Sequence, residues 1–147
     1  MEFILKHFQN LSTEELYDVL QLRAAIFVVE QNCAYNDLDD KDRNGLHLLG
    51  YENNKLIAYA RILPQGISYK EASIGRVVVD KKLRGKSVGK ELMLKAIELT
   101  YNSFNTDKII ISGQQYLEKF YNDLGFVTEG EPYMEDFIPH LKMSLTR

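Results

Sequence analysis

The stretch from Ala72 to Thr100, ASIGRVVVDKKLRGKSVGKELMLKAIELT, decides the fold of this chain. Its first part, as far as Val79, is a β-branched run that predicts a buried strand. From Val88 onward, apolar residues recur at helical spacing and lysines and glutamates occupy the opposite face. The stretch therefore predicts a strand, a short glycine-bearing loop and an amphipathic helix.

The loop between this strand and this helix has the features of a phosphate-binding site. It contains small residues at 85, 87 and 89 and basic residues at 84, 86 and 90: Arg84-Gly85-Lys86-Ser87-Val88-Gly89-Lys90. A helix N-terminus presents unpaired backbone N–H groups and partial positive charge, and small residues let a ligand approach them closely. We therefore expect a phosphorylated ligand at this loop.

The spacing of the glycines excludes a Walker loop and argues against a dinucleotide-binding loop. A Walker loop has four residues between its glycines and then Lys-Ser/Thr, whereas Gly85 and Gly89 enclose three residues and Lys90 precedes Glu91. A dinucleotide fingerprint has three glycines near the start of a βαβ unit, and this loop has two, past the middle of the chain. An unrelated phosphate-binding α/β protein is left as a weaker alternative, which predicts ATP or NAD binding.

The other elements alternate in a way that predicts a mixed α/β (α+β) sheet. The first helix begins at a capping box formed by Ser12 and Glu15, and its apolar face continues toward Val28. A second helix ends at Gly125, a residue suited to a C-terminal cap. The expected strands are Phe3–Phe8, His47–Tyr51, Leu56–Leu63, Lys108–Ser112 and one that starts at Phe126.

Composition narrows the class of protein without naming an activity. At 147 residues the chain has the length of one domain with a substantial core. A net charge of -3 argues against nucleic acid as the main partner. Cys33 is the only cysteine, so neither a disulfide nor a cysteine-rich metal site is expected. We find no signal peptide and no membrane-spanning run, so we expect a cytoplasmic protein without a metal.

The segment from Asp37 to Asp42 is acidic, with aspartates at 37, 39, 40 and 42. A solvated surface loop is the simpler interpretation of these residues. The alternative is that one or two of them face a cationic substrate, which would be consistent with an amine acceptor. An EF-hand is not supported, because the distal glutamate is missing and Gly45 is misplaced.

Two motifs resemble those of the GNAT superfamily of acetyl-CoA-dependent N-acetyltransferases. The loop resembles its Arg/Gln-x-x-Gly-x-Gly/Ala signature: Arg84 and Gly89 match the ends, and Ser87 replaces the central glycine. Phe120-Tyr121-Asn122-Asp123-Leu124-Gly125-Phe126 is similar to the F-Y-x-x-x-G-F element of the family. The resemblance implies that Tyr121 protonates the departing CoA thiolate, although a tyrosine on an apolar helix face is also an ordinary core residue.

Other parts of the chain resemble the ElaA-like branch of the superfamily. In order along the sequence, they are Leu22-Arg23, Phe27 to Tyr35, the acidic Asp37 to Asp42, Ala58 to Pro64 and Glu135 to His140. The resemblance implies a central mixed, mostly antiparallel sheet flanked by helices, with the fourth and fifth strands splayed apart. The backbone of Val77, Val78 and Val79 would then pair with the pantetheine amides, and Gln114 falls where an amide often contacts the cofactor.

The resemblance implies direct attack of a neutral amine on the acetyl thioester, which requires a base or a water path for the amine proton. The predicted central strand, Ala72 to Val79, contains no Asp, Glu or His, so the base is open. The candidates for the base or for substrate contact are Glu30, Glu135, Asp136 and His140.

We therefore expect one domain over residues 1–147 that uses acetyl-CoA as cosubstrate and acetylates a small-molecule or peptide amine. The implied cofactor-binding residues are Val77, Val78, Val79, Arg84, Gly85, Lys86, Ser87, Val88, Gly89, Lys90, Gln114 and Tyr121. Either a single chain or a homodimer is compatible with this function. A catalytically silent acyl-CoA-binding module on the same fold is the alternative from another functional class.

Overall fold

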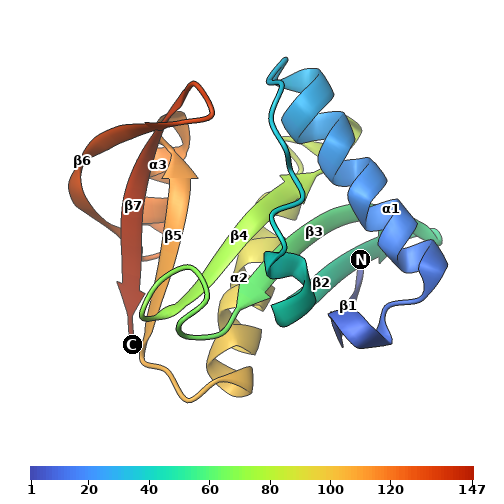
Figure 1. Cartoon of the computed structure of the whole chain (residues 1–147), viewed down its shortest axis with the longest axis horizontal. Helices are drawn as coiled ribbons and strands as arrows, with labels where there is room; N and C mark the ends of the chain where they lie inside the picture. The colour runs from blue at the N-terminus through green and yellow to red at the C-terminus, as the bar shows by residue number, and fades with distance from the viewer.

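A computed structural model describes residues 1–147 and contains one sheet of seven strands in the order β1-β2-β3-β4-β5-β7-β6 (Figure 1). The strands are β1 (Glu2–His7), β2 (Leu46–Glu52), β3 (Lys55–Leu63), β4 (Ala72–Val79), β5 (Lys108–Gln114), β6 (Val127–Glu135) and β7 (Ile138–Thr146). The helices are α1 (Thr13–Arg23), α2 (Val88–Ser103) and α3 (Glu118–Asp123). The predicted mixed, mostly antiparallel sheet is confirmed.

Strands β4 and β5 form the one parallel pair of the sheet and separate almost at once. Their register includes only Ala72 with Ile109 and Ser73 with Ile110. Beyond these pairs the two strands diverge toward their C-terminal ends, as Figure 1 shows. The predicted splay of the fourth and fifth strands is confirmed, and it leaves most of the β4 edge without a neighbouring strand.

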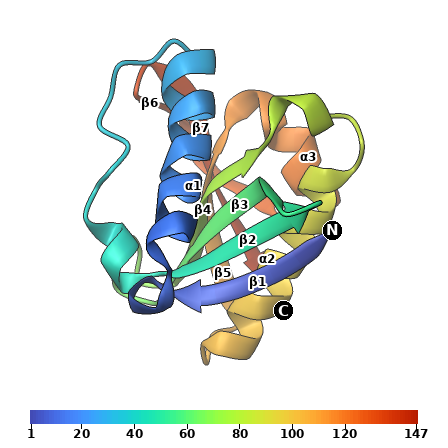
Figure 2. The same cartoon turned by 90° about the vertical axis from the view of Figure 1, so that its right-hand side faces the viewer.

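Helices cover both faces of the sheet, with α1 on one face and α2 and α3 on the other (Figure 2). Alternation along β3 explains the two layers, because successive side chains of a strand point to opposite faces. Ala58 and Ala60 belong to the larger core with Leu92 of α2, whereas Tyr59 packs with Val19 of α1. No helix of the chain combines the length and the apolar composition needed to cross a bilayer.

The first helix ends earlier than its apolar pattern predicts. Its predicted start is confirmed, because Ser12 and Glu15 form the reciprocal hydrogen bonds of a capping box. After Arg23, however, the chain widens into a π-helix, η2 (Ala24–Glu30), instead of continuing as an α-helix to Val28. Because a π-turn changes the residues per turn, Ile26 stays buried while Val29 is 74% exposed.

The two hairpin turns of the sheet place non-glycine residues in the left-handed region. The β2–β3 turn, predicted from its asparagines, has φ values of 52° and 61° at Asn53 and Asn54. The β6–β7 turn has φ values of 49° and 67° at Asp136 and Phe137, and its sequence did not predict a turn. Strand β6 is an edge strand, and its register is interrupted between Glu129 and Tyr133.

The acidic segment is neither a solvated loop nor a rim for a cationic substrate, and both interpretations from sequence are wrong for most of its residues. Asp37 and Asp42 are buried, and Asp39 is half-buried. Three arginines from α1, β3 and β4 neutralise these carboxylates. The members of this arginine–aspartate network are Arg23, Arg61, Arg76, Asp37, Asp39 and Asp42.

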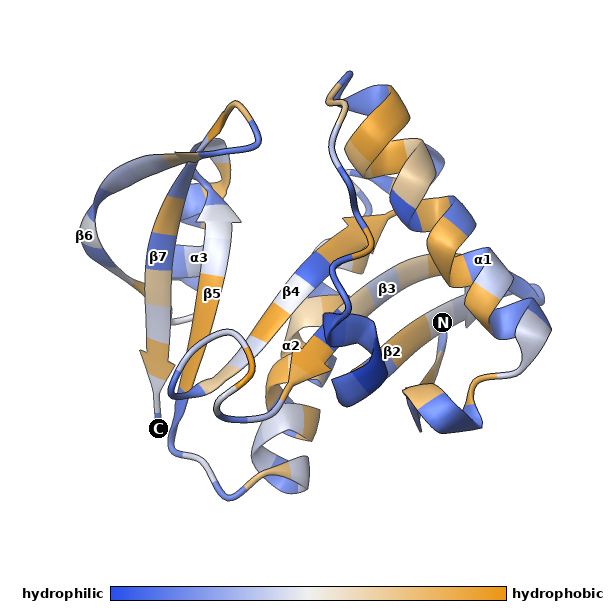
Figure 3. Ribbon diagram, viewed as in Figure 1, coloured by the Kyte–Doolittle hydropathy of each residue, from blue (hydrophilic) through white to orange (hydrophobic).

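The geometry of the network explains why the aspartates are unavailable to a ligand. Arg23 donates from Nε to Asp37 at 2.8 Å and from Nη1 to Asp42 at 2.8 Å. Arg61 donates to Asp42 at 2.9 Å and holds Asp39 with both of its terminal nitrogens. Figure 3 shows the neighbouring η3 (Lys41–Asn44) as a strongly hydrophilic segment, although its one carboxylate, that of Asp42, is buried inside the network.

Candidate active site

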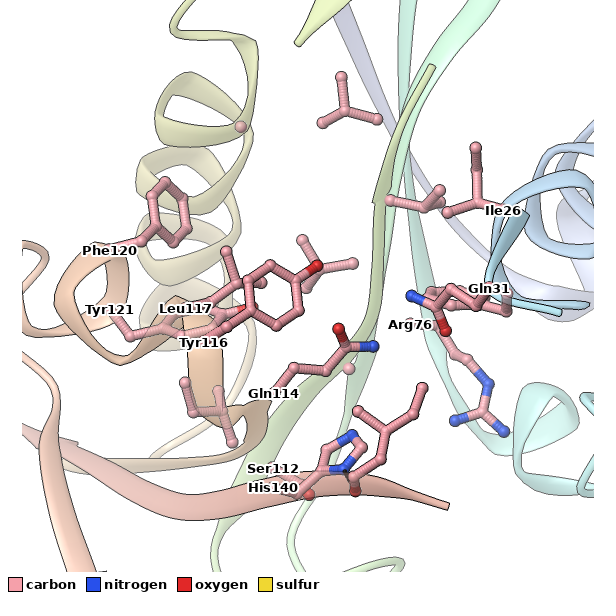
Figure 4. A pocket seen from close by; sticks show the side chains of 18 of the residues that line it. Ile26, Gln31, Arg76, Ser112, Gln114, Tyr116, Leu117, Phe120, Tyr121 and His140 are labelled. Atoms are coloured by element: carbon pink, nitrogen blue, oxygen red, sulfur yellow. Dashed lines mark hydrogen bonds between the residues drawn. The ribbon is translucent and has the colours of Figure 1, made fainter. Parts of the chain in front are cut away.

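The splay between β4 and β5 opens into a cleft with a volume of about 850 Å³. Figure 4 shows one wall formed by Tyr116, Leu117, Phe120 and Tyr121, and the opposite wall formed by Ile26, Gln31 and Arg76. Gln114 points into the space between the walls, and Ser112 and His140 lie at its foot. The cleft is therefore bounded by η2, β4, α3 and the β5–β7 pair.

The loop before α2 lies at one end of this cleft, as the sequence predicts for a phosphate site. Arg84, Gly85, Ser87, Val88, Gly89 and Lys90 line the cleft, whereas Lys86 does not. Gly85 has a φ of 80° and Ser87 a φ of 62°, so the loop turns through two left-handed residues before the helix begins. Ser87 is the N-cap but makes no side-chain capping bond, which leaves the first-turn N–H groups of α2 without a side-chain acceptor.

The edge of β4 forms a second polar surface of the cleft. Val77, Val78 and Val79 all line it. The register pairs Tyr59 with Val78 and Arg61 with Gly75, so Arg76 and Val77 together face a single residue of β3. This β-bulge places Arg76 at a φ of 49°, and bulges of this kind re-aim backbone groups beside functional sites.

Arg84, the first residue of the loop motif, is engaged by a carboxylate. Its guanidinium forms a two-pronged ion pair with Glu30 at the end of η2, and Nη2 donates to Oε2 at 2.7 Å. This hydrogen bond, with the charge of Arg84, lowers the pKa of Glu30. A carboxylate held in this way is a poor proton acceptor, so Glu30 is a weak candidate for the base.

Tyr121 lies on α3 at the wall of the cleft and is 6% exposed. Its ring packs edge-on against Phe120 and Phe126. A Cβ at Gly113 would lie 2.9 Å from Tyr121 Cε2, so the absence of a side chain at 113 makes room for the ring. Burial, with a further contribution from Tyr116, raises the pKa of Tyr121 to about 12, and the phenol stays protonated at neutral pH.

Three further residues predicted as site candidates gather at the other end of the cleft, where β6 and β7 meet. Glu135, Asp136 and His140 all line it. His140 Nε2 lies 3.4 Å from a carboxylate oxygen of Glu135, and Nδ1 lies 2.7 Å from the carbonyl oxygen of Ile138. The backbone oxygen of Asp136 accepts a hydrogen bond from the Cys33 thiol, which joins this hairpin to the segment after η2.

Sequence reasoning missed several cleft residues. Arg76 borders the cleft because of a bulge that no sequence signal indicates, and Ser112 lies on a strand recognised only by its isoleucines. Cys33 and Tyr35 line the cleft because the segment after η2 passes over it. The apolar character of this segment was the available signal. The chain contains no cluster of three or more His, Cys, Asp or Glu placed to hold a metal ion.

A mixed sheet splayed between its fourth and fifth strands, with a small-residue loop at the start of the following helix, is the architecture of the GNAT acyl-CoA N-acyltransferases. The model of the acetyltransferase (GNAT) domain matches residues 11–147, so the chain belongs to this family. Within the family it belongs to the ElaA-like branch. It is 44% identical over 140 residues to the protein ElaA of Escherichia coli, covering 94% of this chain and 92% of that protein.

Two solved structures and a further sequence relative agree with this assignment. The crystal structure of Escherichia coli ElaA has a TM-score of 0.91 at 41% identity, with 99% of each chain covered. The crystal structure of an acyl-CoA N-acyltransferase from Pseudomonas aeruginosa has a TM-score of 0.92 at 36% identity, covering 99% of this chain and 100% of that chain. A UPF0039 protein of Schizosaccharomyces pombe is 42% identical over 147 residues, covering 99% of this chain and 97% of that protein.

Proposed function

We propose that this chain is an N-acetyltransferase that transfers the acetyl group of acetyl-CoA to the primary amine of a small molecule or peptide. One observation carries the proposal: an unpaired strand edge and a helix N-terminus meet in a single cleft. The first surface suits amide groups and the second suits phosphates. Acetyl-CoA presents both kinds of group on one extended molecule. Residues 1–147 would form one domain that acts in the cytoplasm.

The donor would lie along both of these surfaces. Backbone groups of Val77, Val78 and Val79 would pair with the pantetheine amides, because the β4 edge has no strand neighbour there. The pyrophosphate would bind the N–H groups of the loop from Gly85 to Lys90, with positive charge from Arg84. Lys86 would contribute only through its charge, since it lies outside the cleft lining. The Gln114 amide points into the cleft between these surfaces (Figure 4).

Tyr121 would supply the proton that the thiolate needs on departure. Tyr121 lines the cleft and its hydroxyl makes no hydrogen bond with another residue, so it is available to a ligand. The raised pKa keeps the phenol protonated at neutral pH, so it can donate its proton to the CoA thiolate as the C–S bond breaks. The T-shaped contacts with Phe120 and Phe126 fix the orientation of the ring.

The acceptor would be cationic, but the reason differs from the acidic segment noted in the sequence. Asp37, Asp39 and Asp42 are neutralised by arginines. Glu135 and Asp136 line the cleft without a lysine or arginine within ion-pair distance. Two carboxylates at one end of a cleft attract a protonated amine.

The first test is thermal unfolding of the purified protein with acetyl-CoA, CoA, ATP or NAD. A ligand present at one hundred times its Kd stabilises the native state by about 2.7 kcal/mol, which raises Tm by roughly 5–10 °C for a domain of this size. We expect a rise with acetyl-CoA and CoA and none with ATP or NAD. No rise with saturating acetyl-CoA would overturn the proposal, and a rise with ATP or NAD alone would favour an unrelated phosphate-binding function.

The substitution Tyr121→Phe separates catalysis from binding. Loss of the proton donor should reduce the rate of CoA thiol release about 100-fold, because a positioned general acid contributes 10² to 10⁴. The Kd for acetyl-CoA, measured by calorimetry, should change less than about twofold because the ring still packs. Turnover equal to that of the unmodified protein would exclude the acid role, and binding without any turnover in both proteins would indicate a silent acyl-CoA-binding module.

A further inference from the structure

Five polar residues gather on the face of the β5–β7–β6 ribbon that points away from α3. The register places Gln114 opposite His140 and His140 opposite Tyr133, so these side chains share a face. Gly113 and Leu141 are on the opposite face, where the ring of Tyr121 lies against Gly113. We name the set at the foot of the cleft the acceptor-side cluster: Tyr69, Ser112, Tyr133, Glu135 and His140.

Hydrogen bonds connect the members of this cluster. Ser112 Oγ bonds the Tyr133 hydroxyl and lies 3.4 Å from Glu135 Oε1. The ring of Tyr133 stacks on the imidazole of His140 at 6.2 Å between centroids. Burial, with the nearby Tyr133 and Glu135, raises the pKa of Tyr69 to about 12. The cluster therefore holds one imidazole and one carboxylate among neutral hydroxyl groups, and the ammonium of Lys142 lies beside it, 5.6 Å from the centre of the Tyr69 ring.

The contacts of His140 define which ring nitrogen can accept a proton. A carbonyl oxygen is only an acceptor, so the 2.7 Å contact with Ile138 requires that Nδ1 carries a hydrogen. The neutral ring then has its lone pair on Nε2, the nitrogen that faces Glu135 at 3.4 Å. When Nε2 gains a proton, the resulting N–H can donate to Glu135, and the charge of the imidazolium is compensated. The ring is 7% exposed and borders the cleft.

We propose that His140 is the general base that takes the proton of the acceptor amine, and that Glu135 holds the ammonium before transfer and the imidazolium after it. This inference rests on the proposed acetyltransferase function and adds the path of the proton. The amine nitrogen loses one proton to Nε2 of His140 and forms a bond to the acetyl carbon. The C–S bond breaks, the thiolate takes the proton of Tyr121, and the second proton that the attacking nitrogen loses as the amide forms returns through solvent to the Tyr121 phenolate. Tyr121 and His140 both line the cleft and lie on opposite faces of the β5–β7 ribbon.

The test compares His140→Ala with the matched control His7→Ala, which alters an exposed histidine of β1. Thiol release from acetyl-CoA is followed with n-butylamine and spermidine, which are protonated at neutral pH, and with methoxyamine, which is uncharged. We expect H140A to lose about 100-fold in kcat with the protonated amines and much less with methoxyamine. Added imidazole should raise the rate of H140A at least tenfold, because it can occupy the vacated space and accept the proton. H7A should retain the unmodified rate.

A second variant tests the role of the carboxylate without disturbing a buried side chain. The side chain of Glu135 is 46% exposed, so Glu135→Gln should fold normally. It should raise the KM for spermidine several-fold and leave the Kd for acetyl-CoA unchanged.

The outcomes distinguish this inference from the proposed function. If the unmodified protein releases no thiol with any of the three amines, both fail. If it does release thiol and H140A matches H7A, or if the loss is equal for all amines and imidazole restores nothing, only the assignment of His140 fails. Preferential loss with protonated amines and rescue by imidazole would support it.

Discussion

Ser87 shows how a residue other than glycine can adopt the backbone conformation of a loop position where glycine is usual. Its φ of 62° lies in the left-handed region, where a Cβ costs about 1 kcal/mol relative to glycine. The family signature places its central glycine at this position, and the backbone conformation gives the physical reason. Serine keeps the turn at some cost in strain, and its small side chain leaves the N–H groups of α2 accessible.

Glu30 forms an ion pair with the guanidinium of Arg84, which the proposed pyrophosphate site requires. The side chains of Arg84 and Glu30 are 44% and 26% exposed, so their ion pair is weak, on the order of 0.5 kcal/mol. Glu30→Gln removes the competing charge and should tighten CoA binding about two- to threefold. Calorimetric titration with CoA measures this change, with Glu14→Gln on the exposed side of α1 as the control. Weaker binding by E30Q would mean that Glu30 supports the site rather than competing for Arg84.

At the scale of the element, β5 separates the two sides of the proposed chemistry by simple alternation. Ser112 and Gln114 point to one face, and Gly113 lies on the other face against Tyr121. The sequence predicts β5 from its isoleucines, yet it does not reveal that Gly113 is required by an aromatic ring. That requirement arises from packing between β5 and α3, two elements whose relative placement local patterns do not encode.

Gly113→Ala should disturb this packing. The new Cβ would lie 2.9 Å and 3.0 Å from two atoms of the Tyr121 ring, closer than real contacts allow. The ring is buried against Phe126 and cannot move freely, so we expect a loss of about 1–3 kcal/mol in the free energy of unfolding and a fall in turnover. Urea denaturation measures the first effect. Gly75→Ala, where a Cβ meets nothing within 4 Å, should leave stability unchanged. An unchanged G113A would show that the ring can move at little cost.

At the scale of the whole molecule, the arginine–aspartate network joins segments that are distant in sequence. Arg23 ends α1, Arg61 lies on β3 and Arg76 on the β4 bulge, and all bind the segment before β2. Removing one member of such a buried set leaves an uncompensated charge, which typically costs about 3–5 kcal/mol. The network therefore fixes a long irregular segment against the sheet and over one side of the cleft.

The network should make the protein sensitive to acid. Burial alone would raise the pKa of Asp39, but the hydrogen bonds from Arg61 and the charge of Arg76 lower it to about 2. A carboxyl whose folded pKa is depressed stabilises the native state above its ordinary pKa near 3.9, and the contribution disappears as pH falls toward 2. The free energy of unfolding should therefore fall between about pH 5 and pH 2.

Asp39→Asn isolates this contribution. The variant should be less stable than the unmodified protein at pH 7, and the difference should shrink as pH falls from 5 to 3. Urea denaturation at pH 7, 5, 4 and 3 measures both curves. Asp40→Asn is the matched control, because the Asp40 side chain is 86% exposed and pairs only with exposed Arg43. A difference that stays constant with pH would show that Asp39 acts through packing rather than charge.

The sequence predicted what depends on local pattern and missed what depends on distant partners. The strand, loop and helix from Ala72 to Thr100, the capping box at Ser12 and the Asn53-Asn54 turn each carry their signal within a few residues. The acidic segment was interpreted wrongly because the arginines that pair with its aspartates lie on three other elements. The turn at Asp136 and Phe137 was missed because phenylalanine is not typical of a left-handed conformation and no glycine or asparagine marks the turn.

The outer strand β6 also limits how copies of this protein can meet. Its register shift includes Gly130 in the left-handed region, with a φ of 78°, and Pro132, which has no backbone N–H. An extended strand from another chain would therefore find an interrupted row of partners along this edge. Growth of the sheet from one molecule into the next, the first step toward fibrous aggregates, is disfavoured on this side. A homodimer is therefore not expected to extend the sheet through β6, and β1 is the other edge of the sheet.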